Sequence, residues 1–188
     1  SPRKMELLSH FFKQDQIFGD EVRSDLPRDS LTLGVEGVEI IPHIQSSALG
    51  VADAISVVLD EVSGPFLVLL GDNLLLGDHF GPALSGKKGA SEASKRLVSK
   101  FERTGLPAVG VIHLEGEELS KYGVVGISDD KVTHVVEKPS LEDAPSNFVL
   151  CGRYLFPENT MEILESIPIS EFGEMQSIRL IDHLIENG

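Results

Sequence analysis

Three charged residues in this 188-residue chain stand where a folded protein could use them for phosphate chemistry. Asp72 follows the apolar run FLVLLG, and Glu137 and Lys138 end the run VTHVVEK. A carboxylate at the carboxyl end of a buried strand can hold Mg²⁺ while substrate phosphates complete the coordination. A strand-end lysine can reach a phosphate as a point charge, and a neighbouring carboxylate can accept hydrogen bonds from sugar hydroxyls.

Each of these residues also has a purely structural interpretation. Asp is a common turn former and helix cap, and a Glu–Lys pair at a strand end is an ordinary solvated charge pair. Strict alternation along the strand would send Glu137 and Lys138 to opposite faces unless Pro139 bends the chain. Wider sequence context must therefore decide between the two interpretations.

Other familiar chemistries find little support in the sequence. The segment GPALSGKK (81–88) nearly matches a phosphate-binding loop, but it ends in Lys88, which has no hydroxyl for magnesium. The six histidines show no metal-ligand spacing. Cys151 is the only cysteine and lies in an apolar run, so we expect a small buried hydrophobe rather than a nucleophile or a disulfide partner.

Composition limits the partners. Sixteen Lys and Arg against thirty Asp and Glu give a formal net charge of -14, and so acidic a surface repels a phosphate backbone. Nucleic acid and membranes are therefore not expected as partners. Apolar stretches such as 66–70 are far shorter than the roughly 18 residues of a membrane span, and no leader opens the chain, so a cytoplasmic protein is expected.

The elements that would position the charged residues follow from periodicity. Apolar residues at helical spacing predict helices over 3–13, 51–62 and 91–103 and two more at the end of the chain. For the first of these last two helices, Asn159 and Glu162 would form a capping box. Strands are expected over 38–41, 66–70, 108–114 and 147–156, and as a hairpin around a short acidic turn after Tyr122. Strands that alternate with helices indicate an α/β fold with a parallel sheet.

Five segments, in order, resemble the sugar-phosphate nucleotidyltransferases, and within that family the bacterial uridylyltransferases that use UTP and glucose 1-phosphate. They are QSSALGVADAI (45–55), FLVLLGDN (66–73), ELSKYGVVGI (118–127), VTHVVEKPSLEDAPSNFVLCGRYLF (132–156) and GEMQ (173–176). The succession SKYGVV, EKP, APSN and GRY at these separations is highly specific. The resemblance covers nearly all of the chain from residue 38 onward.

The resemblance implies a role for each matching residue on the nucleotide side. Gln45 and Gly50 would recognise the nucleobase, since an amide and a nearby backbone can pair with a uracil or thymine edge. Asp72 would be the Mg²⁺ ligand, and Mg²⁺ is the cofactor that the resemblance implies.

On the sugar side, the resemblance implies four further roles. The backbone at Gly123 would approach the sugar closely, which a missing side chain permits. Glu137 would bind sugar hydroxyls, and Lys138 would bind the sugar phosphate and take part in catalysis. Leu150 would line the sugar pocket, although a buried strand leucine is also ordinary core.

The family's fold implies a Rossmann-like nucleotidyltransferase domain with a mixed, mostly parallel sheet and helices on both faces. We expect residues 1–188 to form a single such domain, incomplete at both ends. The first strand, the Gly-rich GxGxR loop and the second metal-binding Asp of the family are not found, and ADA (52–54) and IRL (178–180) replace the usual GHA and LTD. Residues 1–188 alone are expected to make no UDP-glucose.

The implied activity is the joining of glucose 1-phosphate and UTP into UDP-glucose and pyrophosphate. One alternative is a thymidylyltransferase that uses dTTP, although KYGVV and PSNFVLCGRY favour UTP. Another is a noncatalytic sugar-nucleotide-binding regulatory subunit, which the missing loop would explain. The partners implied are a nucleoside triphosphate, a sugar 1-phosphate and further copies of the chain in a homo-oligomer.

Overall fold

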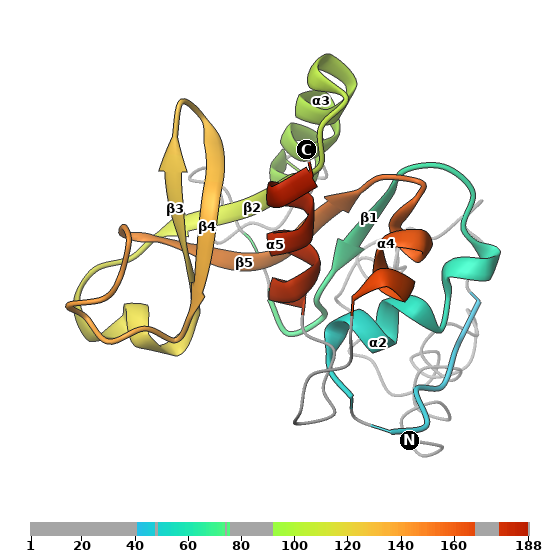
Figure 1. The fold of residues 1–188 in the computed structure, drawn as a ribbon, viewed down its shortest axis with the longest axis horizontal. Helices are drawn as coiled ribbons and strands as arrows, with labels where there is room; N and C mark the ends of the chain where they lie inside the picture. The colour runs from blue at the N-terminus through green and yellow to red at the C-terminus, as the bar shows by residue number, and fades with distance from the viewer. Residues whose placement is uncertain (1–40, 48, 74, 76–91, 168–176, 188) are drawn as a thin grey trace, which may run out of the picture. The chain divides into compact units, whose positions relative to one another are not determined.

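The computed structural model describes residues 41–47, 49–73, 75, 92–167 and 177–187 (Figure 1). The chain divides into two compact units, Ser1–Ala48 and Leu49–Gly188, and all elements below belong to the second. The expected helix 3–13, most of the expected strand 38–41 and the segments 81–88 and 173–176 lie outside the described residues. A single domain over the whole chain stays a prediction.

The second unit is built around one five-stranded sheet, and its central strand is the longest. The strands are β1 (Phe66–Leu69), β2 (Ala108–His113), β3 (Gly123–Ser128), β4 (Lys131–Glu137) and β5 (Phe148–Phe156). Strand β5 pairs with β2 along most of its length, with β1 through its C-terminal half and with β3 near its N-terminal end, where Val149 lies opposite Val124. Tyr154, for example, lies between Val68 of β1 and Val109 of β2.

The expectation of a mostly parallel sheet is wrong. Every strand pair that the structure records among the described residues is antiparallel. Strands β1 and β2 both run opposite to β5, so they run in the same direction as each other, but β5 lies between them. An apolar run shows that both faces of a strand are covered, and it does not fix the direction of the neighbouring strand.

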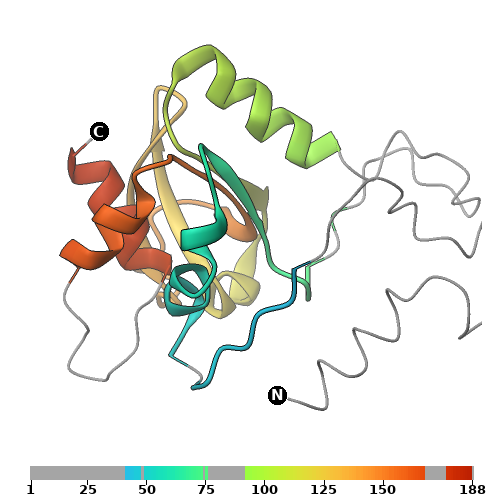
Figure 2. The same ribbon diagram turned by 90° about the vertical axis from the view of Figure 1, so that its right-hand side faces the viewer.

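Helices cover both faces of the sheet, as expected (Figure 2). Helices α2 (Val51–Ser56), α4 (Thr160–Ser166) and α5 (Ser177–Asn187) contact one another. They share a core with β3 and β5 that includes Val125, Tyr154, Phe156 and Leu180. Helix α3 (Glu92–Thr104) contacts β2 and β5 from the other side. None of the helices in the described part of the chain is long and apolar enough to span a membrane.

Two helix predictions need correction. The helix expected over 51–62 ends at Ser56, and a short 3-10 turn, η2 (Leu59–Glu61), follows it. The β-branched Val57 and Val58 at the break lower helix propensity, while the tighter turn still buries Leu59. The capping box of α4 does not form, because Asn159 makes no side-chain cap bond.

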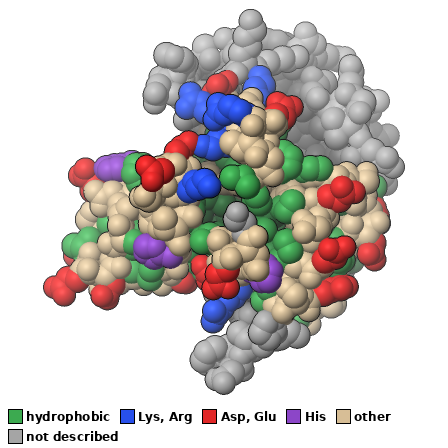
Figure 3. Space-filling model, turned by 45° about the horizontal axis from the view of Figure 1, so that its top comes forward, with side chains coloured by type: hydrophobic (Ala, Val, Ile, Leu, Met, Phe, Trp, Pro, Cys, Tyr) green, Lys and Arg blue, Asp and Glu red, His purple; other side chains and the backbone are tan. Residues whose placement is uncertain are grey.

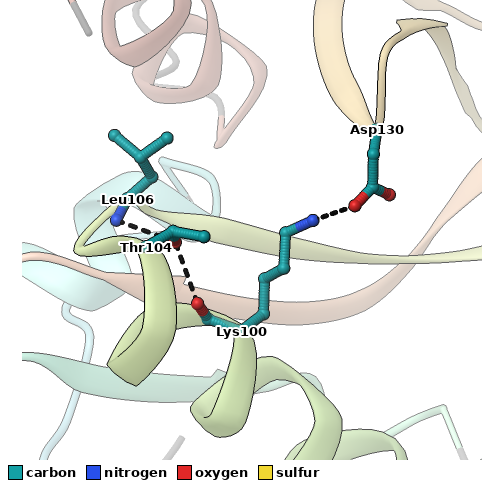
Figure 4. Close-up of polar contacts among 4 residues, drawn as sticks. All are labelled: Lys100, Thr104, Leu106 and Asp130. Carbon is teal, nitrogen blue, oxygen red and sulfur yellow. Dashed lines mark hydrogen bonds and ion pairs between the residues drawn. The ribbon is translucent and has the colours of Figure 1, made fainter.

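The hairpin of β3 and β4 turns through Asp129 and Asp130, which have φ of 50° and 64°. Two successive positive φ values are the mark of a type I′ turn, whose twist matches that of the flanking strands. Lys100 of α3 forms an ion pair with Asp130 across this turn (Figure 4). The Lys100 ammonium lowers the pKa of the Asp130 carboxyl from its usual value.

Positive charge is unevenly spread over this acidic chain. Helix α3 carries Lys95, Arg96, Lys100 and Arg103. Figure 3 shows several lysine and arginine side chains gathered in the upper part of the visible face, with acidic side chains spread over much of the rest. The net charge of the whole chain is therefore a poor guide to the local potential.

Candidate functional site

The base of the β3–β4 hairpin carries three of the predicted site residues. Gly123 pairs with Glu137 in the ladder, and the next residue, Lys138, donates its backbone N–H to the carbonyl oxygen of Tyr122 over 3.0 Å. The 3-10 helix η3 (Gly116–Lys121) leads into β3 just before this point. The segments SKYGVV and EKP are therefore neighbours because the hairpin closes on itself.

Lys138 holds a backbone conformation that side-chain-bearing residues rarely adopt. Its φ is 44°, in the left-handed region that costs a non-glycine residue about 1 kcal/mol or more. This turn of the backbone interrupts the strand alternation that would send Glu137 and Lys138 to opposite faces. The positive φ places the bend at Lys138 itself, just before Pro139. The Lys138 Nζ lies 3.6 Å from the Glu137 Oε1.

Gly123 lies where its neighbours leave too little room for a side chain. A Cβ on Gly123 would be 3.1 Å from the Leu150 Cδ1, 3.1 Å from the Ile178 Cδ1 and 3.2 Å from the Glu137 Oε2. Gly123 is buried, whereas 43% of the Glu137 side chain is exposed. The structure thus brings Gly123, Glu137 and Leu150 together, with Lys138 adjacent to them.

Leu150 and Ile178 belong to or pack against the hydrophobic core and also border Gly123. Leu150 is 8% exposed and belongs to the main core, so its structural interpretation holds even though it borders Gly123. Ile178, in the first turn of α5, was not predicted as a site residue. Its helical spacing assigned it to an apolar helix face, but no pattern in the sequence showed that this face would meet Gly123.

Asp72 lies in a turn at the end of β1. Leu70 donates its N–H to the Gly152 carbonyl over 3.0 Å, and Asn73 donates its N–H to the Leu70 carbonyl over 3.3 Å. Asp72 is exposed within this turn. The turn is attached to β5 two residues beyond Leu150, a spacing of about 7 Å along a strand. One strand thus contacts both the Asp72 turn and the surroundings of Gly123.

Arg153 is a second residue that the sequence analysis did not single out. Its Nη1 donates to the carbonyl oxygens of Leu70 and Gly152, each over 3.1 Å, and its Nη2 donates to the Asn73 carbonyl over 2.5 Å. The motif GRY was noted as a family resemblance, but contacts 80 residues apart in the chain cannot be read from local spacing. Cys151 beside it is buried, as expected, and burial raises the pKa of its thiol.

The described residues around Asp72 fit one kind of metal site. Among the described residues, no group of three or more His, Cys, Asp or Glu could enclose a metal ion. Mg²⁺, however, often binds through one or two carboxylates while waters and substrate phosphates complete its octahedron. An exposed carboxylate on a held turn is compatible with that mode of binding.

The two residues expected at the nucleobase lie in different units of the chain. Gln45 belongs to the first unit and is half-buried. Gly50 precedes α2 with φ of 96°, and its carbonyl accepts the N–H of Ala54 over 3.2 Å. Glycine suits this position because a positive φ strains other residues. The nucleobase role of both residues stays a prediction.

Comparison with known proteins agrees with the resemblance. The family model described as "Nucleotidyl transferase" matches residues 10–188. A UTP--glucose-1-phosphate uridylyltransferase of Haemophilus ducreyi is 32% identical over 179 residues, which cover 89% of this chain and 55% of that protein. A UDP-glucose pyrophosphorylase solved in complex with UDP-glucose is 27% identical, with a TM-score of 0.63 over 77% of this chain and 53% of that one.

A further structural likeness concerns the fold alone. A candidate glucose-1-phosphate thymidylyltransferase of Bacillus anthracis has a TM-score of 0.61 at 21% identity and covers 78% of this chain and 52% of that one. The chain thus spans about half the length of these relatives. Because the family model extends over nearly the whole sequence, the chain belongs to the nucleotidyl transferase family.

Proposed function

We propose that the natural protein joins glucose 1-phosphate to UTP, forming UDP-glucose and releasing pyrophosphate. The observation that carries the proposal is the arrangement at the hairpin base, where Glu137 and Leu150 surround the buried backbone of Gly123 and Lys138 lies adjacent. This arrangement places a hydroxyl acceptor, a cation and an apolar side chain at the residue where the resemblance puts the sugar. The uridylyltransferase and the UDP-glucose complex among the similar proteins support the choice of UTP and glucose.

The chain's own residues would do the work of binding and orientation. The Glu137 carboxylate accepts hydrogen bonds from sugar hydroxyls, while the Lys138 ammonium attracts the phosphate of glucose 1-phosphate. The left-handed backbone at Lys138 keeps these two groups on one side. A sugar and its phosphate are therefore held by two consecutive residues, which fixes the direction of the attacking oxygen.

The reaction needs positioning more than covalent help. A phosphate oxygen of the sugar phosphate attacks the α-phosphorus of UTP in line, and the bond to pyrophosphate breaks as the new P–O bond forms. Lys138 offsets the repulsion between the two anions. When bound at Asp72, Mg²⁺ would neutralise charge on the triphosphate.

A binding measurement on the natural full-length protein tests the proposal. Wild type is expected to bind UDP-glucose in calorimetry and to prefer it over dTDP-glucose. Gly123→Ala adds a methyl group that would displace Leu150, Ile178 or Glu137 at the proposed sugar site, so its affinity for UDP-glucose is expected to fall roughly tenfold or more. A preference for dTDP-glucose would identify a thymidylyltransferase instead, and binding without turnover would identify a regulatory subunit.

A matched control separates pocket filling from general damage. Gly105 directly follows α3 with φ of 68°, and a Cβ added there would meet no atom within 4 Å. Gly105→Ala should therefore lower the melting temperature without changing UDP-glucose affinity. Equal losses of affinity in both variants, or no UDP-glucose binding by wild type, would contradict the proposal. The homo-oligomer implied by the resemblance stays a prediction.

A further inference from the structure

Arg153 connects the central strand to both ends of the turn that contains Asp72. Its guanidinium donates to the Leu70 carbonyl before Gly71 and to the Asn73 carbonyl after Asp72. The Leu70 carbonyl also accepts the N–H of Asn73. One planar group therefore holds the first and the last residue of the turn, and Asp72 lies between them.

Both bonds need the shape of an arginine. The two donors of a guanidinium lie in a rigid fork, so they can reach two carbonyls at once, whereas a lysine offers a single ammonium at the end of a flexible stem. Arg153 is half-buried, and its bonds to neutral carbonyls are charge-assisted. Each of them is therefore stronger than the ordinary bond between two neutral groups.

The neighbouring Gly152 lets β5 approach the turn closely enough for this contact. A Cβ on Gly152 would be 2.6 Å from the Asn73 Nδ2 and 3.0 Å from the Leu70 Cβ. Its carbonyl instead accepts the N–H of Leu70 over 3.0 Å. The pair Gly152 and Arg153 thus supplies one acceptor and two donors to a turn that is far away in sequence.

We infer that Arg153 is a positioning residue, which acts by fixing the Asp72 carboxylate where it can meet a divalent cation bound to the nucleotide. This inference rests on the proposed function for the identity of that ligand, while the clamp itself rests on the bonds above. Arg153 bonds to the backbone carbonyls of Leu70 and Asn73, so it would act through the backbone of the turn. Its loss should weaken the metal–nucleotide step and leave sugar recognition at Gly123 largely intact.

Hydrogen exchange on the full chain tests the clamp without any ligand. In Arg153→Met, and to a smaller extent in Arg153→Lys, the amide of Asn73 should exchange about tenfold faster or more, while amides of the β3–β4 ladder should keep their rates. Arg103→Met is the matched control, because Arg103 is an exposed arginine of α3. Melting temperatures and near-ultraviolet circular dichroism establish that each variant is folded.

Manganese binding tests the positioning role in the natural full-length protein. The dissociation constant of the Mn²⁺–UTP complex from the protein, followed by electron paramagnetic resonance of the bound ion, should rise about 10- to 100-fold in Arg153→Lys, the range usual for lost supports of metal ligands. Affinity for UDP-glucose without metal should stay within about twofold of wild type. Guanidinium or ethylguanidinium ions added to Arg153→Ala should restore part of the Mn²⁺ affinity.

The outcomes distinguish the two ideas. Unchanged exchange at Asn73 in both Arg153 variants overturns the clamp, whatever the protein binds. Faster exchange with unchanged Mn²⁺ affinity overturns the positioning role. Failure of wild type to bind Mn²⁺ with UTP overturns the proposed function, and the positioning role falls with it, although the exchange data would still show the clamp.

Discussion

Two strand ends carry the charged groups of the candidate site, and the chain holds them in different ways. At the end of β4, local backbone holds Glu137 and Lys138, through the ladder pair with Gly123 and a left-handed residue. At the end of β1, a side chain from a distant part of the sequence holds the Asp72 turn. The first arrangement is held by local backbone bonds and carries strain, whereas the second depends on packing between segments.

This difference predicts how each end responds to mutation. Strain at Lys138 disfavours the folded state, so removing it should stabilise the protein even while function is lost. The Asp72 turn carries no strain that a substitution could remove. Its support comes from contacts, which mutation can only weaken. A substitution that relieves the strain at Lys138 and one that weakens the contacts of the Asp72 turn should therefore change the free energy of unfolding with opposite signs.

Substitution of Lys138 should have the largest effect of the changes at the two strand ends. In the natural full-length protein, Lys138→Ala and Lys138→Gly should both lower kcat/KM for glucose 1-phosphate about 30-fold to several thousand-fold, since a charge-assisted contact worth about 2 to 5 kcal/mol is lost. Only Lys138→Gly removes the strain of the positive φ, so its free energy of unfolding should exceed that of Lys138→Ala by about 1 kcal/mol. Steady-state kinetics and urea denaturation measure the two effects.

Two controls make the Lys138 result specific. Lys138→Arg should recover only part of the activity, because a planar fork does not replace a compact ammonium. Lys121→Ala removes an exposed lysine that pairs with Glu118 and should change kcat/KM less than about twofold, as expected for an exposed pair. A Lys138→Ala variant within about threefold of wild type would remove Lys138 from the phosphate site.

Gly152→Ala tests the other strand end and should have the opposite sign. The new methyl group would overlap Asn73 and Leu70 at a backbone φ of 68°, so the free energy of unfolding should fall by about 2 to 4 kcal/mol. Gly105→Ala shares that φ but meets no atom within 4 Å, and should cost only about 1 kcal/mol. Equal costs in urea denaturation would mean that β5 does not need to approach the turn closely.

The sequence predicted local features well and long-range ones poorly. The β3–β4 hairpin, its acidic turn, β5 and α3 were all predicted, because turn chemistry and periodicity act over a few neighbouring residues. The grouping of Gly123, Glu137 and Leu150 was expected only through the family resemblance. Arg153 and Ile178 were missed, since their partners are set by how distant segments pack and no local pattern reports that.

The prediction of strand direction failed for a related reason. The apolar run of β5 correctly indicated a covered strand, whereas β1 is only half-buried and ends in the exposed Leu69. Whether neighbours are parallel depends on which strand inserts between which, and β5 enters between β1 and β2 from the opposite direction. Burial is a property of one strand and can be read from its residues, whereas pairing is a property of two strands.

The smallest expected effect concerns the tip of the hairpin, where Lys100 pairs with Asp130 (Figure 4). If local backbone holds the hairpin, this tie to α3 should matter little, so Asp130→Asn should lower the melting temperature only slightly and leave UDP-glucose affinity unchanged. Because the folded-state pKa of Asp130 is lowered, the stabilisation is present above the unfolded pKa and is lost as pH falls through the folded one. The melting-temperature difference between wild type and Asp130→Asn should therefore shrink from about pH 7 towards about pH 3 and in high salt, because salt screens exposed pairs. A large difference that persists at low pH would show that the hairpin depends on distant contacts as much as the Asp72 turn does.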